Sequence, residues 1–187
     1  MTATLAHQLD PEAVTDELAG CGVTHVVTVP DYVMMSVYRS IEARATPRLV
    51  YSSTEDEAIA VTAGLHIGGA RPMVMMQNQG LYASLNAIRA LAVDARLPVF
   101  MLIGQFGREY ANLGRPARQS ARPLVRNCER ILDALDIPYA RCEAAGDVSK
   151  IAAAYRLAHQ REGAAAALVG TYTAWPGFRP AAGEVPA

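Results

Sequence analysis

Short apolar runs alternate with amphipathic stretches along the whole chain. Six runs rich in valine, isoleucine, leucine, methionine and alanine predict buried strands, and helical stretches separate them. The predicted strands cover residues 23–29, 48–53, 73–77, 98–103, 138–142 and 166–172. Strands that alternate with helices form a mainly parallel sheet covered on both faces. The pattern therefore predicts a three-layer, doubly wound α/β fold with a mainly parallel six-stranded sheet.

Capping residues mark where two helices begin. Asp10 is followed by proline and glutamate, which together supply a side-chain acceptor, a preset backbone angle and an acid at the positive end of the helix dipole. Thr54 and Glu57 have the spacing of a capping box, with Glu57 reaching back to the amide of Thr54. The second helix is therefore predicted to start at Glu55.

Ligands in an open parallel sheet gather at the carboxyl ends of the strands. The segments that follow the first four predicted strands are residues 30–32, 54–57, 77–82 and 104–110. Residues 77–82 are expected to form a polar turn. The stretch 104–123 has no clear period and contains glycine, proline and several arginines, which indicates a long loop.

Composition excludes several classes of protein. The chain has 187 residues, of which 51% are hydrophobic, a length that suits one domain with a substantial core. Seventeen basic and eighteen acidic residues give a net charge of -1 without long blocks of one sign, so neither nucleic acid nor an anionic membrane is an expected partner. Residues 1–175 are predicted to form this domain, with 176–187 as a loosely ordered tail.

Cysteine usage and the amino-terminal residues indicate a cytoplasmic protein. The three cysteines are far apart and lack the spacing of metal ligands, so they are expected to be buried thiols in a reducing compartment. The acidic start of the chain lacks the features of a secretion signal. The longest uncharged stretch, between Arg71 and Arg89, is interrupted by amide side chains and is not a membrane anchor. No metal-binding residues are expected.

Three segments occur in an order that is more specific than any single motif. Residues 54–64 read TEDEAIAVTAG, residues 76–81 read MQNQGL with Asn86 beyond them, and residues 29–32 read VPDY. This combination resembles the pyrimidine-binding domain of thiamine diphosphate enzymes. Within that superfamily it is most similar to the alpha subunits, or N-terminal halves, of sulfopyruvate and phosphonopyruvate decarboxylases. The resemblance extends from about residue 23 to residue 107 and implies the thiamine diphosphate-binding fold.

The resemblance implies a catalytic role for Glu55. Counted back from Gly64, a glycine expected to let this helix pack closely, the glutamate of the family falls on Glu55 and not on Glu57. In the family this carboxyl group hydrogen-bonds N1′ of the aminopyrimidine and favours the tautomer that takes the C2 proton from the thiazolium ring. Most acids in a first helical turn only complement the helix dipole, so this role depends on the resemblance.

The resemblance also implies contacts with the cofactor and the substrate. The expected cofactor-binding residues are Pro30, Asp31, Glu55, Gln77, Asn78 and Gly80. The expected substrate contacts are Tyr32, Tyr82 and Arg108. The two tyrosines replace a serine and a glycine of the family and would reshape the pocket, while Arg108 is shifted past the second glycine of its motif. A solvated surface arginine is an equal alternative for Arg108.

Half of the expected active site is absent from the sequence. Single-chain members of the superfamily hold the diphosphate through Mg²⁺ with a Gly-Asp-Gly motif, and this chain has none. Asp147, which follows a glycine, is better explained as the cap of a helix over 148–160. A beta subunit that carries the diphosphate-binding domain and most Mg²⁺ ligands is therefore the expected partner, in a hetero-oligomer.

The predicted activity is that of a lyase: decarboxylation of a small anionic 2-oxo acid, such as sulfopyruvate or phosphonopyruvate, by the two subunits together. A split carboligase similar to acetolactate synthase is an alternative on the same fold. A non-catalytic scaffold or regulatory subunit with a vestigial site is a second alternative. A general dinucleotide-binding domain is disfavoured because no Gly-x-Gly-x-x-Gly turn follows the first predicted strand.

Overall fold

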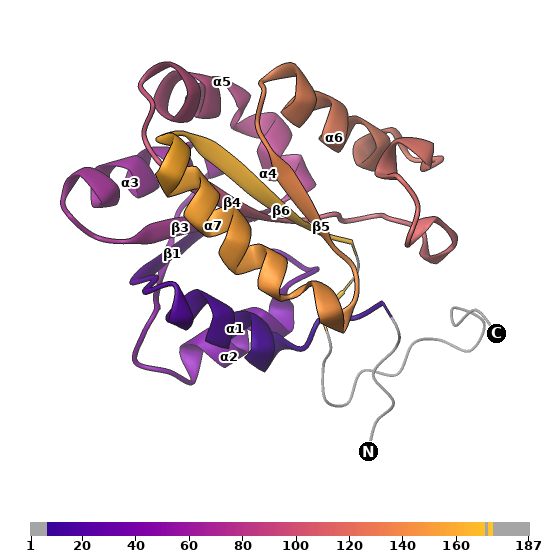
Figure 1. Cartoon of the computed structure of the whole chain (residues 1–187), viewed down its shortest axis with the longest axis horizontal. Coiled ribbons are helices and arrows are strands. Elements are labelled where there is room, and N and C mark those ends of the chain that lie inside the picture. The colour runs from indigo at the N-terminus through magenta and orange to yellow at the C-terminus, as the bar shows by residue number, and fades with distance from the viewer. Residues whose placement is uncertain (1–6, 171, 174–187) are drawn as a thin grey trace.

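The computed structural model describes residues 7–170, 172 and 173, which form a three-layer α/β domain (Figure 1). All six strands of its sheet run parallel, in the order β2-β1-β3-β4-β6-β5. The strands are β1 (His25–Thr28), β2 (Arg48–Tyr51), β3 (Pro72–Gln77), β4 (Val99–Gly104), β5 (Tyr139–Cys142) and β6 (Ala164–Val169). The predicted fold class and all six predicted strands are confirmed. The predicted tail at 176–187 lies outside the described residues.

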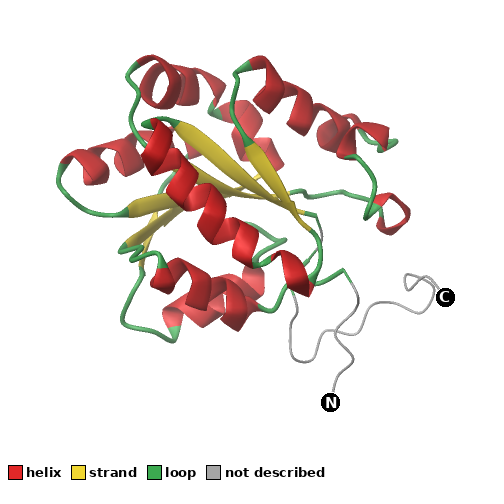
Figure 2. Cartoon of the chain, in the orientation of Figure 1, coloured by secondary structure: helices red, strands yellow, loops and turns green. Residues whose placement is uncertain are grey.

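Helices cover both faces of the sheet (Figure 2). One face is covered by α1 (Pro11–Gly20), α2 (Met35–Glu42) and α7 (Ser149–Arg161). The other is covered by α3 (Glu55–Ile67), α4 (Asn78–Ala83), α5 (Leu85–Ala87), the π-helical turn η1 (Ile88–Asp94) and α6 (Pro123–Ala134). Three short 3-10 turns complete the described chain: η2 (Tyr110–Asn112), η3 (Ala117–Gln119) and η4 (Ala145–Asp147).

Burial on both faces explains the composition of the central strands. All six residues of β4 and of β6 are buried, and five of the six in β3. Successive side chains of a strand point to opposite faces, so Ala165 and Ala167 of β6 pack under α7, while Ala164 and Ala166 face the layer that contains α6. The small side chains of β6 keep both helical layers close to the sheet.

The capping predictions hold with one change. The carboxylate of Asp10 accepts a hydrogen bond from the amide of Glu12 at the start of α1 (3.1 Å). The hydroxyl of Thr54 accepts one from the amide of Glu57 (3.4 Å). The carboxylate of Glu57, however, accepts from the amide of Ser53 (2.6 Å), one residue before the expected amide.

Two local predictions are wrong. Residues 77–82 do not form a turn, because Gln77 ends β3 in extended geometry and α4 begins at the next residue. Asp147 does not cap α7, because its carboxylate accepts hydrogen bonds from the amides of Glu143 (2.9 Å) and Ala144 (3.1 Å) and so closes η4. The long loop at 104–123 is confirmed, with η2 and η3 as its regular parts.

The three cysteines are free, buried thiols, as predicted. Burial raises the pKa of Cys128 and of Cys142 to about 12, which keeps both in the neutral thiol form. Within the described part of the chain, every helix is too short or too polar to cross a bilayer.

The contact between β4 and α7 supplies a test of the core. Phe100 of β4 is 1% exposed, and its ring meets the ring of Tyr155 edge to face with a centroid distance of 5.7 Å. We expect Phe100→Ala to lower the free energy of unfolding by about 3–5 kcal/mol, because it removes this contact and leaves a cavity. Chemical denaturation measures the loss. Leu157→Ala on α7, 38% exposed, is the control and should cost far less; equal losses would contradict this packing.

Candidate functional site

The strand order creates a topological switch point between β1 and β3 at the carboxyl edge of the sheet. The chain leaves β1 for the edge strand β2 and then returns through α3 to β3 on the other side of β1. The connections after β1 and after β3 therefore diverge, and ligands of open α/β sheets bind at such switch points. Residues 29–34 follow β1 here, and α4 follows β3.

Glu55 and Gly80 lie against each other at this edge. Glu55 is the first residue of α3 and is half-buried, and Gly80 lies in the first turn of α4. A Cβ atom added to Gly80 would stand 2.3 Å from Cγ and 2.7 Å from Oε1 of Glu55. The side chain of Glu55 thus occupies the volume that any other residue at position 80 would fill. Gly64, in contrast, is exposed with nothing near its Cβ position, so its expected close packing is absent from the described chain.

Asp31 is completely buried over the end of β4. Its Oδ1 accepts a hydrogen bond from the amide of Val33 (2.7 Å), and its own amide donates to the hydroxyl of Tyr38 (2.8 Å). Its Oδ2 has no hydrogen-bond partner in the described structure and would lie 2.1 Å from a Cβ atom at Gly104. Burial raises the pKa of Asp31 to about 7, although the hydrogen bond from Val33 opposes the shift.

Asn78 ties α4 to the long loop, and Tyr82 ties α4 to the first turn of α6. The side-chain amide of Asn78, which is fully buried, donates to the carbonyl of Phe106 (3.2 Å), while its Oδ1 has no partner among the described residues. The hydroxyl of Tyr82 donates to the carbonyl of Leu124 (2.8 Å), and partial burial raises its pKa to about 12. Gln77, at the end of β3, is partly exposed.

Arg108 points into the protein. Its side chain is 0% exposed, and its guanidinium lies 2.5 Å from Oε1 of Glu143, which is 8% exposed. The same guanidinium donates to the carbonyls of Asn112 (3.2 Å) and Arg115 (2.7 Å). Because the guanidinium of Arg108 is bound to the carboxylate of Glu143 and to carbonyl groups of its own loop, its position argues against the expected contact with an anionic substrate.

Pro30 and Tyr32 are exposed on the loop that carries Asp31. Tyr32 is 67% exposed, and its ring meets that of Tyr172 edge to face at 6.3 Å. The structure thus brings Glu55 and Gly80 into contact just beyond β3, and places Asp31 against Gly104 at the end of the neighbouring strand β4; Tyr32 is exposed on the loop beside Asp31.

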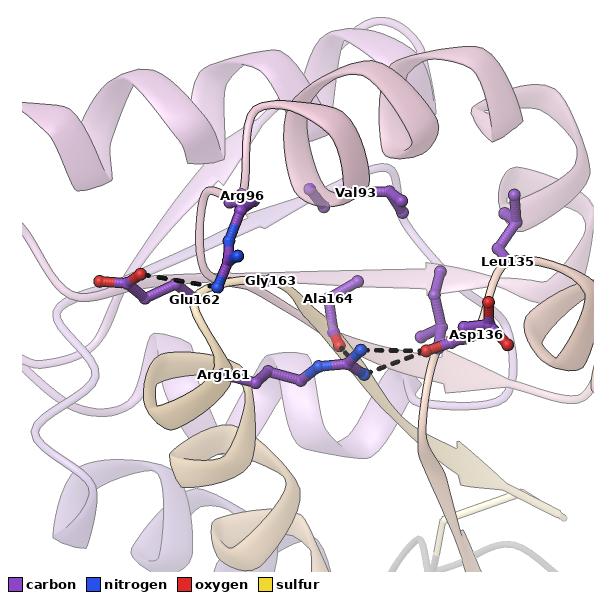
Figure 3. Close-up of a pocket in the computed structure, with 10 residues that line it drawn as sticks. Val93, Arg96, Leu135, Asp136, Arg161, Glu162, Gly163 and Ala164 are labelled. Atoms are coloured by element: carbon purple, nitrogen blue, oxygen red, sulfur yellow. Dashed lines mark hydrogen bonds and ion pairs between the residues drawn. The ribbon is translucent and has the colours of Figure 1, made fainter.

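A separate pocket of about 380 Å³ lies at the opposite, amino edge of the sheet (Figure 3). Arg161 crosses it and donates to the carbonyls of Asp136 (3.1 Å) and Ala164 (3.3 Å), while Arg96 and Glu162 form an exposed ion pair at 3.9 Å. Arg96, Asp136 and Glu162 follow the ends of η1, α6 and α7 with left-handed φ angles of 57°, 52° and 49°. Converging helix ends form this pocket, and none of the residues expected at the site lines it.

Sequence reasoning missed Gly104 and Glu143. Gly104 ends β4 and leaves space for Asp31, and a Cβ atom at Gly170, just after β6, would lie 2.7 Å from Cγ of Glu143. The signal in the sequence was a glycine at the end of each of two apolar strands, Gly104 and Gly170. The sequence did not indicate which acidic side chain would lie against each glycine.

Burial of Asp31 predicts a dependence of stability on pH. Its pKa is about 7 in the folded chain and near 3.8 when exposed, so between these values the folded state binds more protons and stability falls as pH rises. We expect the free energy of unfolding of the wild type to fall by roughly 2–4 kcal/mol more between pH 4 and pH 8 than that of Asp31→Asn. Denaturation curves at each pH measure both proteins, and the subtraction cancels other titrating groups. Parallel curves would show that Asp31 ionises freely.

Comparison with known protein families identifies the domain. Residues 11–126 match the family described as "Thiamine pyrophosphate enzyme, N-terminal TPP binding domain". The chain belongs to this family, as the resemblance predicted. The matched segment includes Asp31, Glu55, Asn78, Gly80 and Arg108.

Individual relatives are decarboxylases by name. The chain is 28% identical over 128 residues to sulfopyruvate decarboxylase subunit alpha of Methanothermobacter thermautotrophicus, covering 68% of this chain and 74% of that protein. It is 26% identical over 126 residues to the same subunit of Methanocaldococcus jannaschii, covering 67% and 72%. Phosphonopyruvate decarboxylase of Streptomyces hygroscopicus is 38% identical over 92 residues, which are 49% of this chain but 23% of that protein.

A solved structure shows the same fold. The 2-oxoglutarate:ferredoxin oxidoreductase from Magnetococcus marinus superposes with a TM-score of 0.64 at 14% sequence identity. The match covers 86% of this chain and 29% of that one. At this identity the likeness supports the architecture alone.

Proposed function

We propose that this chain is the pyrimidine-binding alpha subunit of a two-subunit thiamine diphosphate-dependent 2-oxo acid decarboxylase. Membership of the family and the names of the relatives support the class of reaction. The observation that carries the proposal is the approach of Glu55 to Gly80 at the switch point of the sheet. It brings a half-exposed carboxyl group next to backbone that has no side chain of its own.

The residues around Glu55 fit the pyrimidine half of the cofactor. An aminopyrimidine needs a carboxyl group at its N1′ atom, and Glu55 supplies a half-buried one at the start of α3. Asn78 has a buried Oδ1 without a partner, which would suit an exocyclic amino group. Gln77 and the backbone at Pro30 and Asp31 complete the proposed cofactor contacts.

Glu55 is proposed to transfer the proton to and from the aminopyrimidine ring. Its carboxyl group would hold a proton against N1′ and return it during the cycle, which requires a site from which bulk water is largely excluded. The bound cofactor would supply the electron sink that decarboxylation requires. On the Asp31 side of the carboxyl edge, Asp31 and Val33 are already buried within the described chain.

A beta subunit is proposed to complete the site. The sequence has no Gly-Asp-Gly motif, and among the described residues there is no group of three or more His, Cys, Asp or Glu side chains suited to a metal ion. Mg²⁺ with the cofactor's diphosphate is therefore assigned mainly to the partner, in a hetero-oligomer.

The proposed substrate is a small anionic 2-oxo acid, in line with the sulfopyruvate and phosphonopyruvate named for the relatives. Tyr32 and Tyr82 are the side chains of this chain proposed to shape the pocket. Because Arg108 is bound to Glu143, the cation that meets an anionic substrate is assigned to the partner.

Removal of the Glu55 carboxylate tests the proposal directly. We expect Glu55→Gln to lower carbon dioxide release by the complex of both subunits by about 10² to 10⁴ fold, the usual contribution of an acid-base group. The assay uses a panel of 2-oxo acids with thiamine diphosphate and Mg²⁺. Glu57→Gln, two residues further along the same turn, is the matched control and should stay near wild type. If the complex with Glu55→Gln binds cofactor and releases carbon dioxide as fast as the wild-type complex, the chain is a scaffold with a vestigial site.

The space at Gly80 supplies a second test. Gly80→Ala places a Cβ atom in the volume of the Glu55 side chain, which must then move. We expect kcat to fall at least about tenfold, since small displacements of a catalytic group are costly. Gly20→Ala is the control, because Gly20 also lies in a helix but has open space at its Cβ position. Equal activity of the two variants would mean that the position of Glu55 is not important.

A further inference from the structure

The end of the described chain binds the loop that follows β1. Thr173 is 5% exposed, and its amide donates to the carbonyl of Val33 (2.9 Å). Its hydroxyl donates to the same carbonyl (3.1 Å). Because that hydroxyl has one proton, the hydroxyl of Ser36, 2.5 Å away, must donate to Thr173. Three hydrogen bonds therefore join residues that are about 140 positions apart in the sequence.

These bonds lie at the carboxyl edge of the sheet. Gly104 ends β4, the strand next to β6, and Val33 lies beside Gly104, so Thr173 meets the loop that follows β1 at the end of β4. Tyr172, the residue before Thr173, packs against the core on the α2 face and meets the ring of Tyr32 edge to face. Both residues of this C-terminal contact thus lie against the loop 30–33.

Val33 links Thr173 to Asp31 because it is hydrogen-bonded to both residues. Val33 accepts from Thr173 with its carbonyl and donates to Oδ1 of Asp31 with its amide (2.7 Å). The Cβ atom of Val33 would lie 2.8 Å from a Cβ atom at Gly104, so Val33 and Asp31 share the space beside that glycine. A change at Thr173 therefore acts on the carboxyl group of Asp31 by releasing Val33.

We propose that Thr173 is a positioning residue of the active site, which holds the loop 30–33 so that Asp31 stays buried over Gly104. Thr173 lies beyond residues 11–126, the segment that the family model matches. Its consequence for catalysis rests on the proposed function, but its hold on Asp31 does not. Without the Thr173 hydroxyl, the carbonyl of Val33 keeps the amide donor of residue 173 but loses its second donor, and Ser36 loses its acceptor, so the loop 30–33 is held less firmly over Asp31.

Few groups complicate the titration of Asp31. In the part of the chain that the structure describes, the titratable side chain bonded to Asp31 is that of Tyr38 in α2, whose pKa is itself raised by burial. The end of β4 presents Gly104, and the loop presents Val33, neither of which has a charged side chain. The midpoint of Asp31 therefore reports its hydration.

The first experiment measures that midpoint in the full chain without a partner. Carbon-13 NMR of the Asp31 carboxyl group should give a midpoint near 7 in the wild type and one lower by roughly a unit or more in Thr173→Val, because hydration favours the ionised form. Thr173→Ser keeps the hydroxyl and should restore the wild-type value. If the valine variant does not fold, Ser36→Ala removes the partner hydroxyl from the other side and should lower the midpoint in the same direction. An unchanged midpoint in the folded variants overturns the proposal.

The second experiment uses the complex with the partner subunit. We expect Thr173→Val to raise KM for the 2-oxo acid about tenfold or more with a smaller change in kcat, and Thr173→Ser to behave as wild type, since a loose loop weakens binding before chemistry. Equal KM values in the two variants overturn the catalytic part of the proposal. A shifted midpoint with no decarboxylase activity would count against the proposed function alone, and activity with an unshifted midpoint against Thr173 alone.

Discussion

Three glycines along the carboxyl edge of the sheet determine where the acidic side chains of this edge can lie. At or just beyond the ends of β3, β4 and β6, a glycine leaves a space that an acidic side chain from elsewhere in the chain fills. The pairs are Gly80 with Glu55, Gly104 with Asp31, and Gly170 with Glu143. A Cβ atom at any of the three glycines would stand less than 3 Å from the acid, a distance that protein interiors do not tolerate. The edge therefore presents carboxyl groups close to bare backbone.

The three acids differ in what compensates their burial, and this difference separates their roles. Glu143 pairs with the buried guanidinium of Arg108, an arrangement that is strongly destabilised when either partner is removed. Among the described residues no cationic side chain offsets the burial of Asp31, so burial favours its neutral form. Glu55 is half-buried at the start of a helix and remains accessible. Among these three, only Glu55 offers a carboxyl group that a ligand can approach, and this geometry agrees with the role that the resemblance implied.

The sequence predicted the six strands and the start of α3 because both depend on local patterns. Apolar runs define the parallel strands, and Thr54 caps α3 through neighbouring amides. The role of Glu55 was implied by the family resemblance and not by any local rule, and its contact with Gly80 is visible only in the tertiary structure. The pairing of Arg108 with Glu143 spans 35 positions and depends on how the long loop folds back, so the arginine was expected to face a substrate. Thr173 gave no signal, because only the tertiary structure brings it to the loop after β1.

The two sides of the carboxyl edge are buried to different degrees, and this difference is consistent with the proposed sharing of the site between two chains. On the α2 side, Thr173, Val33 and Asp31 are all buried within the chain, so that side needs nothing further to exclude water. On the α3 and α4 side, Glu55 is partly exposed. A carboxyl group that exchanges a proton with a cofactor has to be reachable before binding and dry afterwards. This chain meets the first condition at Glu55, and a surface placed over α3 and α4 would meet the second.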